Sequence, residues 1–159
     1  MTDRAVAVRT AVFPRDTATV SRLAAAYHSQ TESEKVVRAL TDGDAPLPER
    51  YAREIAEPAT AFHGRRVVIA SVGDDDCGMV VVAATPTGTD VSRLWTTPDA
   101  RGHGVGAALV TAAIDDAAVP VRLSVWEWRE PAIRLYRRLG FEPVASWDDR
   151  EKMVCLERR

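Results

Sequence analysis

Three glycines at alternate positions, Gly102, Gly104 and Gly106, form the part of the sequence best suited to chemistry. They follow a segment rich in β-branched and aromatic residues, 91–98, and precede an apolar segment, 107–114, so a strand–loop–helix junction is predicted. Glycines leave backbone N–H groups free to converge on an anion, and the helix start adds roughly half a positive charge. The spacing predicts a site for a phosphate-bearing ligand, with a plain flexible connection as the alternative.

Two familiar phosphate-binding motifs do not fit this loop. No Gly-Lys-Ser or Gly-Lys-Thr follows the glycines, which excludes the P-loop. The spacing is G-x-G-x-G rather than G-x-G-x-x-G, which excludes the dinucleotide fingerprint. The glycines by themselves therefore leave the identity of the phosphate-bearing ligand open.

A second motif occupies residues 132–141, Ala-Ile-Arg-Leu-Tyr-Arg-Arg-Leu-Gly-Phe. Together with residues 101–106 it resembles the GNAT acyl-CoA-dependent N-acetyltransferases, whose signatures are R/Q-x-x-G-x-G/A and A-I-x-L-Y-x-x-x-G-F. The resemblance is strong over 91–141, weaker to 156 and only general before Met79. It implies an α/β (α+β) fold of GNAT type, a mixed, mostly antiparallel twisted sheet with helices on both faces.

The resemblance implies acetyl-CoA as the acyl donor. The pyrophosphate is expected on the backbone N–H groups of the loop, that is, on Arg101, Gly102, His103, Gly104, Val105, Gly106 and Ala107. Strand 94–96 is expected to splay from strand 123–126, and the pantetheine arm would enter the opening. A backbone N–H of Trp95 or Thr96 would then polarise the thioester oxygen.

Tyr136 is expected to act as the catalytic acid that protonates the departing CoA thiolate, as the matching tyrosine commonly does in relatives. A core tyrosine is the alternative, because Ala132, Leu135, Tyr136 and Leu139 share one helical face. No general base can be named. The candidates are a water relay and the side chains of Asp90, Glu127, Glu130, Glu32 and His28.

Arg129 stands where relatives often carry asparagine. We expect it either to meet a CoA phosphate or an acidic substrate, or to be an ordinary solvated arginine. Arg134, Arg137 and Arg138 are candidates for the 3′-phosphate, with a solvated basic helix face as the alternative. Trp126 and Trp128 project to one side of their strand, where they either wall an acceptor pocket or cover the core.

The resemblance implies transfer of the acetyl group to a primary amine, on a small molecule or on a protein. The acceptor site is expected between the N-terminal helices and a loop at 30–48. Four acidic residues there leave a polyamine acceptor open: Glu32, Glu34, Asp42 and Asp44. The alternative function is a module that binds acyl-CoA as a sensor or partner without transferring the acyl group.

Hydrophobic periodicity predicts the elements that must position these residues. Helices are expected from Thr17, with Asp16 as N-cap, and at 49–57, 107–118 and 132–139, whereas most of 27–58 reads as loop. Strands are expected at 4–13, 65–72, 79–85, 91–97, 121–125, 141–146 and 152–157. No internal repeat or linker is visible, so a single domain over 1–159 is expected.

Charge, hydropathy and cysteine spacing limit the classes of partner that we expect for this protein. A net charge of −2 over 159 residues argues against nucleic-acid binding as the main role. The longest apolar run is far shorter than the about 20 residues that cross a bilayer, and the N-terminus lacks a secretion signal. Cys77 and Cys155 lie outside any C-x-x-C pattern. We therefore expect a cytoplasmic protein with two reduced thiols, no metal site and no membrane contact, and a homodimer remains possible.

Overall fold

The computed structural model describes residues 5–159, and its centre is a seven-stranded sheet in the order β1-β2-β3-β4-β5-β7-β6. Only the β4–β5 pair is parallel, and the other neighbouring pairs are antiparallel. The expected mixed, mostly antiparallel sheet is thus confirmed. The strands are β1 (Val6–Thr10), β2 (Arg66–Val72), β3 (Asp75–Thr85), β4 (Gly88–Thr96), β5 (Val121–Trp126), β6 (Glu142–Val144) and β7 (Met153–Arg158).

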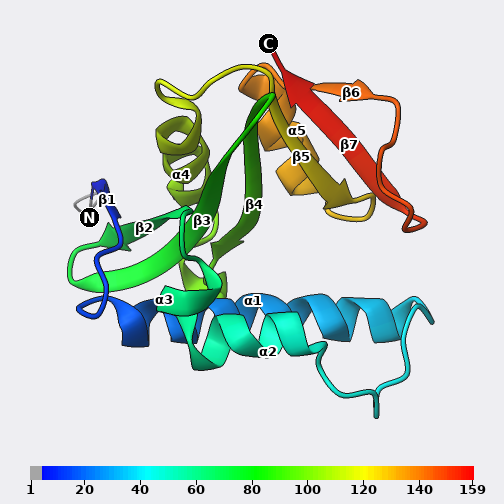
Figure 1. Ribbon diagram of the computed structural model, residues 1–159, viewed down its shortest axis with the longest axis horizontal. Helices are drawn as coiled ribbons and strands as arrows, with labels where there is room; N and C mark the ends of the chain where they lie inside the picture. Colours follow the sequence, from blue (N-terminus) through cyan, green and yellow to red (C-terminus); the bar gives the residue numbers. More distant parts are fainter. Residues whose placement is uncertain (1–4) are drawn as a thin grey trace.

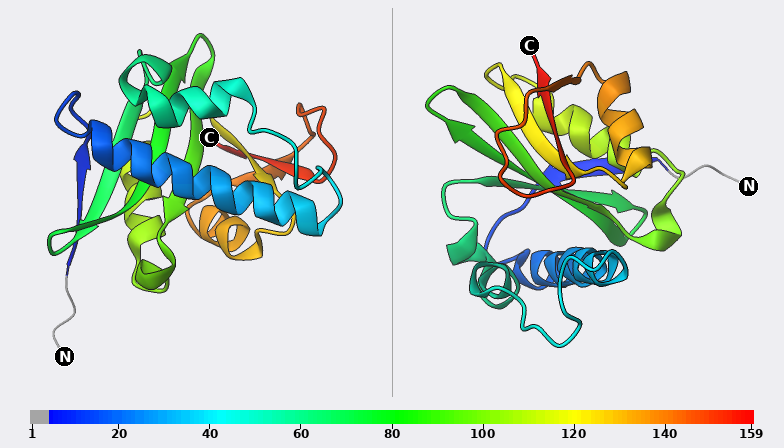
Figure 2. Two further views of the ribbon diagram at one scale, coloured as in Figure 1. Left: turned by 90° about the horizontal axis from the view of Figure 1, so that it is seen from below. Right: turned by 90° about the vertical axis from the view of Figure 1, so that its right-hand side faces the viewer.

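Helices cover both faces of this sheet (Figures 1 and 2). One face carries α1 (Thr17–Val37), α2 (Glu49–Ala56) and α3 (Pro58–Ala61), and the other carries α4 (Val105–Ile114) and α5 (Glu130–Arg138). A 3-10 turn, Pro98–Ala100, precedes α4. Each face has its own core, with Leu23, Phe62 and Met79 in the first and Leu109 and Phe141 in the second. Burial on both faces explains the apolar runs in β2 and β3.

The sheet opens in the middle. β4 and β5 pair at only two positions, Thr89 with Val121 and Asp90 with Arg122, and then diverge (Figure 1). A bulge in β4 accompanies this opening, since Arg93 and Leu94 together oppose the single residue Val80 of β3. Arg93 adopts a left-handed backbone conformation there, with φ of 58°. The expected splay of the two strands is confirmed.

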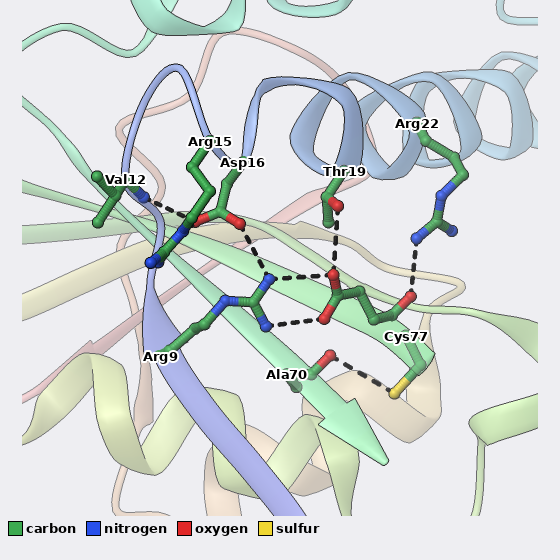
Figure 3. A network of polar contacts seen from close by, with 9 residues as sticks. Arg9, Val12, Arg15, Asp16, Thr19, Arg22, Ala70 and Cys77 are labelled. Carbon is green, nitrogen blue, oxygen red and sulfur yellow. Dashed lines mark hydrogen bonds and ion pairs between the residues drawn. The ribbon is translucent and has the colours of Figure 1, made fainter. Parts of the chain in front are cut away.

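A polar network fixes the start of α1 against the β2–β3 hairpin (Figure 3). The Arg9 guanidinium donates to Asp76 at 2.8 Å and to Asp16 at 3.1 Å. Asp16 also accepts the Val12 N–H at 2.8 Å and, contrary to expectation, makes no side-chain cap bond to α1. The Val12 N–H, together with Arg9, holds the pKa of Asp16 below its ordinary value. These bonds orient α1 across the strands before it reaches the opening.

Several boundaries differ from the prediction. α1 continues to Val37 where a loop was expected from Tyr27, because Glu34 in its second half pairs with Trp128 and Arg129 of the segment between β5 and α5. β3 begins at Asp75 instead of Met79, and α4 begins at Val105 and ends at Ile114 instead of spanning 107–118. Helix α3 was not expected. Pro58 starts it, which suits a first helical residue that needs no N–H partner.

Within the described residues 5–159, no helix combines the length and the apolar character that crossing a membrane requires.

Cys77 and Cys155 are both buried free thiols. Burial raises the pKa of the Cys77 thiol, and the neighbouring carboxylates of Asp75 and Asp76 raise it further. The Cys77 thiol is therefore a poor nucleophile at neutral pH.

Candidate functional site

The glycine loop has the geometry of an anion site. Gly102 and Gly104 have φ of +80° and +81°, and a Cβ on either would meet nothing within 4 Å. Their backbone conformation, rather than a lack of space, therefore calls for glycine. Gly104 is the N-cap of α4, and its carbonyl accepts the N–H of Ala108. The N–H groups of residues 105–107 precede the first intrahelical donor, so they are free at the positive end of the helix.

A groove of about 610 Å³ extends from this loop between α1 and α5. Among the described residues that line it, Glu34 is the only carboxylate, against five arginines: Arg38, Arg101, Arg129, Arg134 and Arg138. Such a groove suits a ligand that carries several phosphates. Of the three arginines on α5 that were candidates for a phosphate, Arg134 and Arg138 line the groove, and Arg137 is not among its lining residues.

The structure brings nearly all of the predicted cofactor residues to this groove. It is lined by Trp95, Thr96, Arg101, Gly102, Gly104, Val105, Gly106, Ala107 and Arg129. His103 differs, because it is not among the described lining residues of the groove and instead lines a second depression together with Asp74 and Asp75.

The end of β4 offers backbone groups to the groove. The N–H of Thr97, just after β4, donates to the carbonyl of Cys77 in β3 at 2.8 Å. Successive N–H groups along a strand point alternately to its two edges. The N–H of Thr96 therefore faces the splayed side, while that of Trp95 faces β3. The Thr96 carbonyl, on the same splayed side, accepts Arg101 Nε at 3.0 Å. Between the two residues named for polarising a carbonyl, the geometry favours Thr96.

A second, smaller cavity of about 120 Å³ lies in the opening between β4 and β5. Leu94, Arg129 and Ala132 line both this cavity and the groove, so the two adjoin. Tyr136 lines the cavity from α5 with only 5% of its surface exposed. Burial raises the pKa of its phenol, Tyr27 adds to this, and no hydrogen bond to its hydroxyl contributes. Tyr136 is thus a protonated donor without a partner among residues 5–159.

Arg129 is not a solvated surface residue. Its side chain is 18% exposed, and it donates to Glu34 through Nε at 3.0 Å and through Nη2 at 3.2 Å. Nη2 also donates to Thr31 Oγ1 at 2.7 Å, and the Trp128 indole donates to Glu34 at 3.0 Å. Burial lowers the pKa of Arg129, but the hydrogen bond to Glu34 outweighs it. This cluster fixes the segment before α5 to helix α1.

Of the two tryptophans near this segment, one lines the cavity and the other lines the groove. The rings of Trp126 and Trp128 stack with their centroids 4.7 Å apart. Trp126 lines the cavity, and Trp128 lines the groove. Trp126 therefore walls the cavity, which is the first of the two roles considered for this pair.

Glu54 of α2 is the centre of a buried ionic cluster. Both of its carboxylate oxygens accept from Arg93, at 2.8 and 2.9 Å, and His28 Nε2 lies 2.8 Å from Oε1. Burial raises the pKa of Glu54, but the hydrogen bonds from His28 and Arg93 prevail and lower it to about 2. The cluster holds Arg93, and with it the β4 bulge, in place.

Replacing Glu54 by glutamine is expected to destabilise the fold by about 3 kcal/mol at pH 7, because Arg93 loses its buried counter-charge. A carboxylate whose pKa falls from 4.5 to about 2 on folding stabilises above pH 4.5 and loses this effect as the pH falls towards 2. The difference in the free energy of unfolding between wild type and variant, measured by urea unfolding, should therefore shrink from pH 7 to pH 4 and again to pH 3.

The matched control is Glu49→Gln on the same helix, whose carboxylate is exposed and lies 3.4 Å from Arg53. It should cost less than about 0.5 kcal/mol at every pH. An equal loss in both variants would contradict the role given to Glu54.

Of the five side chains considered as general bases, only His28 lines the cavity. Its ring is buried and stacks on Tyr51 with centroids 4.4 Å apart, and its Nδ1 has no hydrogen-bond partner among residues 5–159. Sequence reasoning missed Lys35, Arg93 and Arg150, which also line the cavity. The one available signal was an arginine between the apolar residues Val91 and Leu94 of a strand, at Arg93.

Known acetyltransferases are similar to this chain in sequence and in fold. Residues 63–143, a little more than half of the chain, match the family model of the acetyltransferase (GNAT) domain. A stretch of 79 residues is 34% identical to an uncharacterised N-acetyltransferase of Methanocaldococcus jannaschii. That match covers 45% of this chain and only 35% of the relative's length.

Solved structures agree over a longer stretch. The PaiA N-acetyltransferase of Thermoplasma acidophilum, in complex with coenzyme A, is similar with a TM-score of 0.70 at 16% identity, covering 98% of this chain and 99% of that one. A nourseothricin acetyltransferase is 30% identical with a TM-score of 0.52, covering 60% and 65% of the two chains. The fold is that of these acetyltransferases, and the chain belongs to the GNAT acetyltransferase family.

Proposed function

We propose that this protein transfers an acetyl group from acetyl-CoA to a primary amine by direct attack of the amine on the thioester. The observation that carries the proposal is the junction of the two hollows at Leu94, Arg129 and Ala132. A groove that suits phosphates meets there a small cavity lined by Tyr136, whose hydroxyl has no hydrogen-bond partner among residues 5–159. The C–S bond of the thioester breaks as the new C–N bond forms; the sulfur gains a proton from Tyr136, and the proton that the nitrogen loses restores the phenol by way of water.

The residues of the groove suit the donor. The free N–H groups at the start of α4 suit a pyrophosphate, and the arginines of α5 suit a further phosphate. The splayed edge of β4 offers the N–H and carbonyl of Thr96 to an extended arm, once Arg101 releases that carbonyl. These fits support acyl-CoA as the donor. The cavity of about 120 Å³ favours a small acyl group such as acetyl.

Tyr136 suits the leaving group. Tyr136 lines the cavity and its hydroxyl makes no hydrogen bond to residues 5–159, so it can donate to a sulfur that gains negative charge. Burial raises the pKa of the phenol, and the same desolvation would raise the pKa of a thiolate beside it, so the proton transfer stays feasible. The N–H of Thr96 is the donor that would stabilise negative charge on the carbonyl oxygen.

The proposal is tested by measuring thiol release from acetyl-CoA against a panel of amines, with the acetylated product identified by mass spectrometry. We expect release that depends on the amine and a product that carries one added acetyl group. Binding of acetyl-CoA without release from any amine would overturn the proposal in favour of an acyl-CoA-binding module.

A further inference from the structure

The charged side chains among the described residues that line the cavity between β4 and β5 are all positive. Four cationic side chains line it, from four different segments: Lys35, Arg93, Arg129 and Arg150. No aspartate or glutamate is among the described residues that line it. The acidic residues that left a polyamine acceptor open, Glu32, Glu34, Asp42 and Asp44, are thus not lining residues of this cavity.

Each cation is paired with a carboxylate that is not among the described lining residues of the cavity. Arg93 is paired with Glu54, which lines an outer depression beside α2 and α3, and Arg129 is paired with Glu34, which lines the groove. Lys35 is paired with Glu32, and Arg150 with Asp148. The pairs keep these cations in place at the lining of the cavity.

Each of the three arginines also has a hydrogen-bond donor that its structural partner does not use. Each uses Nε and Nη2 for its structural partner: Arg93 for Glu54, Arg129 for Glu34 and Thr31, and Arg150 for Asp148. In the described part of the chain, Nη1 of these three arginines makes no hydrogen bond. A planar guanidinium fixed on one side and free on the other is a preorganised donor to an anion.

Aromatic rings complete the walls. Tyr27, Tyr51 and Trp126 line the cavity. The Arg150 guanidinium lies 5.3 Å from the centre of the Trp126 ring, and Lys35 Nζ lies 5.5 Å from it. The cations rest on these rings and gain further order from the contact.

We infer that the amine acceptor carries a carboxylate, as an amino acid does, and that Arg93, Arg129 and Arg150 bind this carboxylate. The inference rests on the proposed transfer reaction and names its substrate class. A polyamine or aminoglycoside would place several ammonium groups against like charges and is disfavoured. The same positive lining favours the neutral form of the reacting amine, which is the nucleophile.

The test compares acceptors that differ in the carboxylate alone. Wild-type enzyme is assayed for thiol release with tyrosine, tyramine and tyrosinamide, and with lysine and cadaverine, each rate expressed per concentration of unprotonated amine. We expect kcat/KM for at least one amino acid to exceed that of its counterparts without a carboxylate by about tenfold or more. Equal or better use of the decarboxylated amines would overturn the inference and leave the proposed transfer intact. Failure of every amine would instead overturn the transfer reaction itself.

Arg150→Gln tests the assignment of the cations. Arg150 lies in the loop before β7, so the core is not disturbed. We expect a rise in KM of about tenfold for the preferred amino acid and no change for its decarboxylated amine. The control, Arg53→Gln, removes an exposed arginine that pairs with Glu49 and does not line the cavity, and it should change neither value. An equal loss for both acceptors in Arg150→Gln would overturn the carboxylate assignment.

Discussion

Replacing Gly104 by aspartate is expected to raise the Kd for acetyl-CoA by at least about 100-fold. Aspartate at this N-cap position would accept the N–H groups of Gly106 and Ala107, which are the groups proposed to bind pyrophosphate. Two charge-assisted hydrogen bonds of about 1.5–3 kcal/mol each would be lost, and a negative charge would face the phosphates. Isothermal titration with acetyl-CoA measures this effect directly.

The fold should survive that change. A Cβ at Gly104 meets nothing within 4 Å, and aspartate tolerates a left-handed backbone better than most residues. Gly104→Ala is the matched control, because it brings the same backbone strain of about 1 kcal/mol without charge or a capping oxygen. We expect it to bind acetyl-CoA within about tenfold of wild type. Normal affinity in the aspartate variant would remove the glycine loop from the cofactor site.

Replacing Tyr136 by phenylalanine is expected to lower kcat by about 100-fold or more, with little change in the affinity for acetyl-CoA. The hydroxyl is proposed to supply the proton that the sulfur needs as the C–S bond breaks. It makes no hydrogen bond to residues 5–159, so its removal leaves no buried polar atom unsatisfied. The ring keeps its edge-to-face contact with Phe141, at a centroid distance of 5.7 Å.

Steady-state thiol release measures this second effect. The melting temperature and the titration with acetyl-CoA serve as controls, and both should match wild type. If kcat is unchanged in Tyr136→Phe, Tyr136 is a packed core residue and not the proton donor. A parallel loss of acetyl-CoA affinity would instead place the hydroxyl in binding rather than in the chemical step.

Local signals in the sequence predicted the parts of the site that one segment builds by itself. The glycines at 102, 104 and 106 imply a backbone conformation and a helix start, and both are present at α4. Tyr136 was identified within its own helical motif and lies in the cavity. Pro131 and Gly140 likewise marked the ends of α5 to within two residues. These features depend on neighbours in the chain, which a single sequence displays.

Contacts between distant segments could not be predicted. Glu34 and Arg129 are 95 positions apart, and their pairing turns an apparently polar loop into the second half of α1. The positive lining of the cavity has the same origin, since α1, β4, the segment before α5 and the loop before β7 each contribute one cation. Arg150 lies in a loop with nothing in its surroundings to mark it. Only the splay of β4 and β5 brings these residues together.

The central claim is that acyl-CoA lies on the start of α4 and enters the opening between β4 and β5. A crystal structure of the protein with coenzyme A tests this most directly. The account predicts the pyrophosphate on the N–H groups of residues 102–107, the pantetheine arm beside Thr96, and the sulfur within reach of the Tyr136 hydroxyl. Coenzyme A bound elsewhere, or a sulfur remote from Tyr136, would contradict it.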